Sequence, residues 1–167
     1  CERLGIPYGV YLYSYATSVE DASSEADHVL RLIEGKNLSF PVYYDLEDNS
    51  IQGADVATIA QTFCDKIEES GHPVGVYANL YWWNNYLTDS CFDNWYRWVA
   101  QWAESCTYTG EYAMWQYTSQ GTVDGISENV DMNFAIGYAE DHNTTNYDSD
   151  AAVKFAQDNW DNDNLGV

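Results

Sequence analysis

One short pattern occurs twice in the chain, and this repeat limits the possible folds more than any other feature. Gly5-Ile6-Pro7-Tyr8-Gly9-Val10-Tyr11 returns as Gly71-His72-Pro73-Val74-Gly75-Val76-Tyr77. Each copy has the pattern of a glycine that ends a helix, followed by a proline and a buried strand. Because Gly and Pro are common wherever a helix gives way to a strand, the repeat taken alone is also explained by two independent helix ends. Combined with alternating strands and helices, it predicts βα units and a parallel sheet or barrel.

Strands and helices are expected to alternate through the first half of the chain. The first helix starts at the capping-box pattern Thr17-x-x-Glu20 and stops at Gly35, and a second covers about 54–70. Three strands accompany these helices, at 7–15, 40–46 and 74–79. The second half is expected to be mostly β, with strands at 97–102, 112–118 and 130–136.

Charge excludes several classes of partner. Among 167 residues, 27 are acidic and 6 are basic, which gives a net charge of −21. Nucleic acids and anionic membrane surfaces are therefore not expected as partners, because phosphate binding needs Lys and Arg. No segment has the apolar length of a membrane span.

The four cysteines leave the redox state open. They lack C-x-x-C spacing, so a zinc site is not expected. Cys91 and Cys106 flank one short segment and can form a disulfide in an oxidising setting, but reduced thiols agree equally well with the sequence. Cys64 lies on the apolar face of the expected second helix and is predicted to be a core residue.

The strand at 40–46 runs into carboxylates. Side chains alternate along a strand, so Asp45 and Glu47 are expected to project from the same side. Two close carboxyl groups resist ionising together, which raises one pKa. One group can then donate a proton while the other stays anionic, a division of labour used in glycoside hydrolysis. A second interpretation makes Asp45, Glu47 and Asp48 oxygen ligands of Ca²⁺ or Mg²⁺, although no EF-hand spacing accompanies them.

Four segments in order give the chain a specific resemblance. They are the Gly5–Tyr11 segment, the Asp45-Leu46-Glu47 pair after an apolar strand, the Gly75–Asn79 segment, and Met114-Trp115-Gln116-Tyr117 followed by Gly125-Ile126 and Val130-Asp131-Met132-Asn133. Together they resemble the glycoside hydrolase family 25 muramidases, the lysozymes of the Chalaropsis type. The resemblance covers about residues 1–137.

The resemblance implies a fold and an activity. The fold is α/β, an irregular TIM-like (β/α)5(β)3 barrel, with active residues at the carboxyl ends of its strands. The activity is hydrolysis of the β-1,4 bond from N-acetylmuramic acid to N-acetylglucosamine in peptidoglycan, with net retention, no cofactor and no metal. Glu47 would be general acid and then base. Asp45 would stabilise the developing positive charge or orient the N-acetyl group, and Asp131 matches a further active-site aspartate.

Aromatic and amide side chains near other strand ends are expected to line the sugar groove. Tyrosine and tryptophan side chains offer a flat apolar face and a polar tip. The candidates for substrate binding are Tyr13, Tyr15, Tyr77, Trp102, Trp115 and Gln116.

The ends of the chain depart from the family pattern. Relative to the family, the chain is expected to lack the first two barrel strands, so that a separate segment or a second copy would complete the barrel. Residues 138–150 are expected to be a polar linker, and 151–167 a terminal helix or the start of an amidase-like module. A non-catalytic glycan-binding remnant therefore stands as the alternative to a wall-lytic enzyme. The family resemblance implies action outside the cell or at the cell wall, as a secreted autolysin or phage endolysin.

Overall fold

The computed structural model of the chain describes residues 1–136, which fall into two units. The first unit is Cys1–Arg97, and the second begins at Trp98. The expected linker at 138–150 and the segment 151–167 lie outside the described residues.

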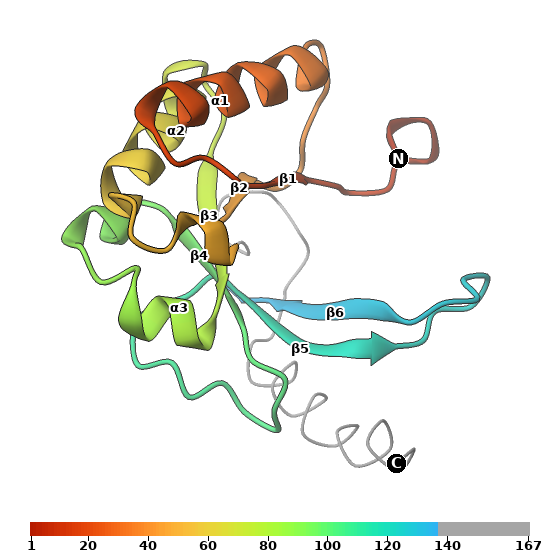
Figure 1. The fold of residues 1–167 in the computed structure, drawn as a ribbon. Helices are drawn as coiled ribbons and strands as arrows, with labels where there is room; N and C mark the ends of the chain where they lie inside the picture. The colour runs from red at the N-terminus through yellow and green to blue at the C-terminus, as the bar shows by residue number, and fades with distance from the viewer. Residues whose placement is uncertain (137–167) are drawn as a thin grey trace. The chain divides into compact units, whose positions relative to one another are not determined.

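The first unit contains three parallel strands. β1 (Val10–Tyr13) pairs with β2 (Val42–Asp45), and β2 pairs with β3 (Val74–Asn79). Helix α1 (Val19–Ile33) connects the first two strands, and helix α2 (Val56–Glu69) connects the next two (Figure 1). The predicted βα units are therefore confirmed, and β3 has the predicted bounds.

Both connecting helices begin at a side-chain cap. Ser18 accepts a hydrogen bond from the backbone N–H of Asp21, and Asp55 accepts one from Thr58, each at 3.1 Å. The prediction that Thr17 caps α1 is wrong by one residue. Thr17 lies just before the cap, where its backbone N–H and its hydroxyl both donate to the Asp21 carboxylate. The backbone N–H of Ser18 also donates to the Asp21 carboxylate, so Ser18 and Asp21 form the reciprocal pair of a capping box.

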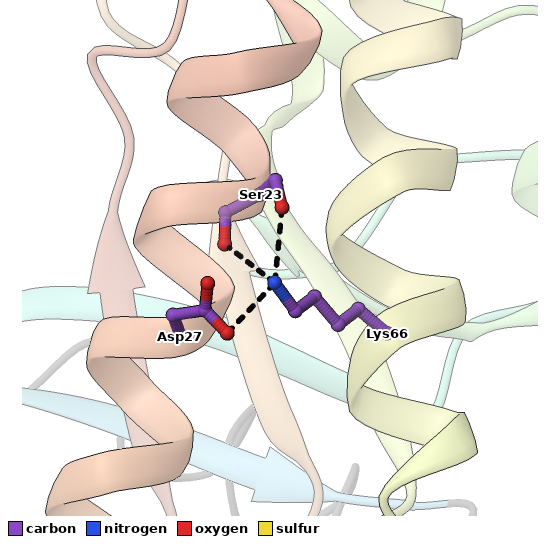
Figure 2. Close-up of polar contacts among 3 residues, drawn as sticks. All are labelled: Ser23, Asp27 and Lys66. Carbon is purple, nitrogen blue, oxygen red and sulfur yellow. Dashed lines mark hydrogen bonds and ion pairs between the residues drawn. The ribbon is translucent and has the colours of Figure 1, made fainter.

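A lysine ties α1 to α2. The Lys66 ammonium donates to the backbone oxygen of Ser23 at 3.2 Å and to its hydroxyl at 3.0 Å (Figure 2). It also pairs with Asp27 at 2.7 Å. Since Lys66 and Asp27 are partly exposed, the contribution of this ion pair is small, and the contacts mainly fix how the helices lie side by side.

The core of the first unit lies between these helices and the strands. Tyr44 of β2 stacks on Phe63 of α2, with ring centroids 3.8 Å apart and an angle of 1° between the ring planes. The surrounding residues are buried and almost entirely aliphatic: Ala22, Ala26, Val42, Leu46, Ile59, Ile67, Val74 and Val76. Cys64 is buried among them, as predicted.

The structure gives the sequence repeat a physical reason. The first glycine of each copy, Gly5 or Gly71, has a positive φ of 66° or 88°, which favours glycine. The second glycine of each copy, Gly9 or Gly75, also has the same physical reason in both copies. A Cβ on Gly9 would lie 2.8 Å from the Cβ of Phe40, and one on Gly75 would lie 2.4 Å from the Tyr43 ring. Both second glycines therefore allow close approach to the chain in or just before β2.

Replacing Gly75 is expected to destabilise the first unit strongly. In Gly75→Ala the new methyl would also meet the carbonyl oxygen of Tyr96 at 2.6 Å, and backbone cannot move aside as a side chain can. We expect a loss of about 3 kcal/mol in the free energy of unfolding, measured by denaturant titration.

The matched control is Gly71→Ala, where the added Cβ meets nothing within 4 Å and only the positive φ is strained. That variant is expected to lose about 1 kcal/mol. Equal losses for the two variants would contradict the close approach at Gly75.

The first strand differs from the prediction in length and burial. β1 spans four residues instead of nine, and its side chains alternate between half-buried and exposed. It is an edge strand within the described part of the chain, and Tyr11 and Tyr13 are exposed. The expectation of a buried strand in the first copy of the repeat is therefore wrong, whereas β3 in the second copy is mostly buried.

Short helical segments complete the first unit. Helix α3 (Leu80–Asn85) follows β3 without a connecting residue and was not predicted. Three 3-10 turns lie at Glu2–Leu4, Asn49–Ile51 and Ser90–Asn94. The side chain of Asn79 caps α3, which places the first turn of this helix directly at the end of β3.

The second unit is built mainly from strands, as predicted. β4 (Tyr96–Ala100) begins in the first unit and continues into the second. From Trp98 to Ala100 it runs parallel to β5 (Met114–Gly121), which pairs antiparallel with β6 (Val130–Ala135). Trp115, Tyr117 and Phe134 form the buried cluster of this unit, with Tyr117 and Phe134 stacked at 4.5 Å.

All four cysteines are free thiols in this structure. Of the two states left open by the sequence, the structure therefore has Cys91 and Cys106 reduced. Within residues 1–136, no helix has both the length and the apolar character needed to cross a membrane.

Candidate active site

The parallel register brings three strand ends to one edge of the first unit. Tyr13 of β1 is the register neighbour of Asp45 of β2, which in turn neighbours Tyr77 of β3. Side chains in register project from the same face of a parallel sheet. Asp45 therefore lies between two tyrosine positions at the carboxyl edge, where the sequence placed it.

Asp45 is a buried carboxyl group. The residue is 4% exposed, and among the described residues its Oδ1 has no hydrogen-bond partner. Burial, and secondarily the charge of Glu47, raise the pKa of Asp45 to about 8. The predicted raised carboxyl of the pair is thus Asp45, which is protonated at neutral pH in the substrate-free protein.

This burial makes a prediction for stability against pH. A carboxyl whose pKa is 3.8 when unfolded and about 8 when folded stabilises the fold fully at low pH, and this stabilisation is lost as pH rises to about 8. Asp45→Asn cannot titrate, so its free energy of unfolding should fall less between pH 5 and pH 9, by roughly 2–4 kcal/mol.

Denaturant titrations of both proteins at the two pH values measure this difference. Any fixed cost of burying the amide cancels, because it is the same at both pH values. Parallel pH dependences for the two proteins would contradict the burial of an ionisable Asp45.

Glu47 is oriented by an asparagine from the next strand. Glu47 lies two residues past Asp45 and is half-buried, and its Oε2 accepts a hydrogen bond from Nδ2 of Asn79 at 3.1 Å. The other end of the Asn79 amide, Oδ1, caps α3 by accepting from the backbone N–H of Trp82 at 3.1 Å. The cap fixes which end of the amide faces Glu47, so the donor points at the carboxylate.

Asn79 was not among the predicted site residues. It stood in the Gly75–Asn79 segment that carried the family resemblance, and its position as the last residue of a buried strand was the available signal. Its function as a cap depends on α3, which the sequence did not reveal.

Asp48 belongs to the same edge but has a different environment. Its carboxylate accepts hydrogen bonds from the backbone N–H of Ser50 at 2.8 Å and from the hydroxyl of Tyr13 at 2.9 Å. A side-chain hydrogen bond with Ser50, followed by these two bonds, lowers the pKa of Asp48. Within residues 1–136, no group of three or more His, Cys, Asp or Glu side chains is arranged to hold a metal ion, so the cation interpretation gains no support.

Two tyrosines of the β1 side are exposed beside these carboxyl groups. The Tyr13 and Tyr15 rings lie 5.1 Å apart at an angle of 52°. The Tyr13 hydroxyl bond to Asp48 holds one ring, and the Tyr15 backbone N–H donates to Glu25 of α1 at 3.0 Å. The Tyr13 ring and the Tyr15 backbone are therefore held in place, and both rings have accessible surfaces, as a sugar contact requires.

The second unit holds the other predicted aromatic positions. Trp102 is 62% exposed, and its Nε1 donates to Oε1 of the buried Gln116 at 3.0 Å. Trp115 is 1% exposed and donates to the backbone oxygen of Gln101 at 2.8 Å. Trp115 is therefore a core residue in this structure, because its ring packs in the cluster with Phe134.

Asp131 is an exposed residue of β6, in the second unit. The neighbouring Asn133 pairs in register with Gln116 and accepts a hydrogen bond from Nε1 of Trp98 at 2.8 Å. This contact gives Asn133 a structural role in holding the Trp98 ring. The structure thus brings Asp45, Glu47, Tyr13 and Tyr77 to one edge of the first unit, while Trp102, Gln116 and Asp131 belong to the second.

Comparisons with known proteins find relatives among cell-wall lytic proteins. The chain is 28% identical over 133 residues to the autolytic lysozyme of Clostridium acetobutylicum, covering 78% of this chain and 40% of that protein. Among solved structures, the modular autolysin LytC of Streptococcus pneumoniae matches with a TM-score of 0.71 and 32% identity, over 79% of this chain and 34% of that one. The catalytic domain of a Listeria monocytogenes bacteriophage endolysin matches with a TM-score of 0.69 and 25% identity, over 93% and 74%.

These likenesses confirm the α/β fold class and its agreement with a partial TIM-like barrel. The chain spans well under half the length of the lysozyme and of the autolysin. Residues 2–126 match the family model described as glycosyl hydrolases family 25, which is most of the chain and nearly all of its described part. The chain therefore belongs to glycosyl hydrolase family 25.

Proposed function

We propose that this chain is the catalytic part of a peptidoglycan hydrolase that cleaves the β-1,4 bond between N-acetylmuramic acid and N-acetylglucosamine. The observation that carries the proposal is the edge cluster of Asp45, Glu47 and Asn79, in which one carboxyl is buried and the other is oriented by an amide. Family membership supplies the class of reaction. The protein acts outside the cell or at the cell wall, where its substrate is found.

The two carboxyl groups have different roles in proton transfer. At neutral pH the proton bound by the pair rests on the buried Asp45 in the free protein. An acetamido N–H that donates to Asp45 favours its carboxylate form and so releases the proton that the reaction needs. Glu47 gives it to the glycosidic oxygen as the bond to the sugar breaks, and then accepts a proton from the water that completes hydrolysis.

Asp45 and Asp131 contribute to the reaction through their negative charge. Once ionised, Asp45 stabilises the positive charge that develops on the sugar ring, or holds the N-acetyl group in position. Asp131 contributes as a further active-site carboxylate, a role that follows from the family resemblance. Trp102 is the indole of the second unit that we retain as a sugar contact, because its ring is accessible and anchored by Gln116.

Lysis of purified peptidoglycan tests the proposal. We expect the turbidity of a wall suspension to fall on addition of the protein, and to fall equally in the presence of a chelator. Loss of lysis with the chelator would favour a metal-dependent hydrolase. Sedimentation of the protein with the walls, without any lysis, would favour the glycan-binding alternative.

Asn79 is expected to act on the reaction through Glu47. Asn79→Ser keeps an oxygen that can cap α3 but, being shorter, removes the amide N–H that reaches Glu47. We expect kcat to fall about tenfold with little change in KM, and the pH–rate profile to shift, because a positioning bond to the reacting group is lost.

Asn79→Ala is the comparison variant, since it removes both the cap and the donor. It should show the same fall in kcat and, in addition, lose about 1 kcal/mol in the free energy of unfolding. An unchanged kcat and pH profile for Asn79→Ser would limit Asn79 to capping the helix.

A further inference from the structure

A second pair of tyrosines stands at the same edge as Glu47, on the side of β3. Since α3 follows β3 without a gap and is capped by Asn79, its first turn lies at the carboxyl edge. Tyr81 is the second residue of that helix and is 61% exposed. The amide that caps α3 also contacts Glu47, so the helix start and this carboxylate are joined through one side chain.

Tyr81 is held in a small aromatic group. Its ring lies 5.9 Å from that of Tyr86, edge to face at 67°, and Tyr86 lies 4.6 Å from the buried Trp82. A side-chain hydrogen bond with Tyr81 raises the pKa of Tyr86. The backbone oxygen of Tyr81 accepts from Asn85 at 2.7 Å. Tyr81 therefore has an accessible ring whose position is held by neighbouring residues.

The arrangement is two-sided about the carboxyl groups. Tyr13 and Tyr15 stand on the β1 side, and Tyr81 and Tyr86 stand on the β3 side. The strand that carries Asp45 lies between β1 and β3. A polysaccharide offers alternating apolar C–H faces along its length, and tyrosine rings suit such faces because they combine a flat apolar surface with a polar tip.

Charge agrees with a ligand that is held by stacking. The chain has 27 acidic and 6 basic residues, so strong attraction of anionic groups is not available to this edge. Sugar rings of a glycan backbone need no cationic partner, whereas phosphate-rich polymers do.

We propose that Tyr81 and Tyr86 form a saccharide subsite on the β3 side, opposite Tyr13 and Tyr15, so that a glycan strand is held on both sides of the bond next to Glu47. The inference rests on the proposed function and adds the direction of the substrate, which crosses the edge from β1 to α3. It assigns the protein a preference for cutting within long strands, because short fragments can fill only one of the two subsites.

The test compares Tyr81→Ala with Tyr81→Phe and with Leu32→Ala. Leu32 is as exposed as Tyr81 but lies in the last turn of α1, at the other edge of the strands, and serves as the surface control. With soluble uncrosslinked glycan strands, we expect Tyr81→Ala to raise KM about tenfold while kcat stays within about twofold, since a stacking contact is lost equally in the bound and transition states.

Tyr81→Phe keeps the ring face and should stay within about twofold of the parent KM, as should Leu32→Ala. The advantage of long strands over tetrasaccharides in kcat/KM should also shrink in Tyr81→Ala. A KM for Tyr81→Ala equal to that of the parent would overturn the subsite, and so would an equal rise in Tyr81→Ala and Leu32→Ala.

A binding measurement separates this inference from the proposed function. In a Glu47→Gln background, which is expected to bind without turnover, sedimentation with insoluble peptidoglycan gives an apparent Kd. Tyr81→Ala in that background should raise the Kd about tenfold. A parent without turnover, combined with this loss of binding, would refute the proposed hydrolysis and keep the subsite, whereas an active parent with unchanged binding would refute the subsite alone.

Discussion

Glu47→Gln is expected to lower the rate of peptidoglycan lysis by about 10²- to 10⁴-fold, the range lost when a general acid–base group is removed. The glutamine side chain has nearly the same shape, and its oxygen can still accept the hydrogen bond from Asn79 that the structure gives Glu47. It has no proton to transfer at neutral pH, so the chemical step fails while binding is kept. Initial rates of turbidity loss, with the amount of wall-bound protein measured in parallel, give the result.

The matched control for this variant is Glu69→Gln. Glu69 is an exposed residue at the end of α2, and its replacement changes the net charge by the same amount. We expect normal lysis and an unchanged thermal midpoint. Lysis by Glu47→Gln at the rate of the control would remove Glu47 from the general acid–base role.

Asp45→Asn is expected to reduce kcat by about 10²- to 10³-fold. The amide cannot take up or release the proton that the buried Asp45 holds, and it cannot offer a negative charge to the sugar in the transition state. The pH profile of kcat/KM, which reports the free protein, should also lose the limb that the pair produces near the pKa of Asp45. Rates on glycan strands from pH 5 to pH 9, at saturating and at low substrate concentration, measure the two effects.

The burial of Asp45 makes it necessary to check that the variant is folded. Because the variant places an amide in a buried position, its thermal midpoint and its binding to peptidoglycan are measured first, and rates are compared only at temperatures where both proteins are folded. A folded variant that binds normally and keeps at least half of the parent rate would refute the role of Asp45.

The fold of the first unit was largely predictable because its local signals agree. The helix at α2 has an apolar face of Val56, Ile59, Ala60, Phe63 and Ile67, all of which are buried, and it ends before Gly71, where a positive φ requires glycine. The second repeat then gives β3 with the predicted bounds. In such segments periodicity, terminators and turn residues all indicate the same structure.

Other local features were missed because short-range patterns compete. Thr17 and Ser18 are both good caps, and the position of Asp21 three residues after Ser18 selects the latter. The α3 segment has six residues and contains Tyr81, Trp82 and Trp83, which have modest helix propensity. Burial of the two tryptophans and the Asn79 cap hold this turn, and neither contact can be read from spacing.

The positions of the two carboxyl groups were predictable from the sequence, but which of them carries the raised pKa was not. Strand alternation placed Asp45 and Glu47 on one side, and the expected raised pKa is present. Which of the two carries it depends on burial, and burial is set by residues distant in the sequence that pack around β2. The same limit explains Trp115, where the sequence pattern cannot tell a ring in the core from one in the groove, whereas the structure separates it from the exposed Trp102.

The measurement that tests the central claim most directly is the identity of the reducing ends released from purified peptidoglycan by this chain. Products are reduced with borohydride, digested to disaccharide peptides and identified by mass spectrometry, with Glu47→Gln treated in parallel. A muramidase with Glu47 as general acid gives reduced muramic acid with the parent chain and only background amounts with the variant. Reduced glucosamine ends, or muramic acid ends in equal amounts from both proteins, would contradict the account.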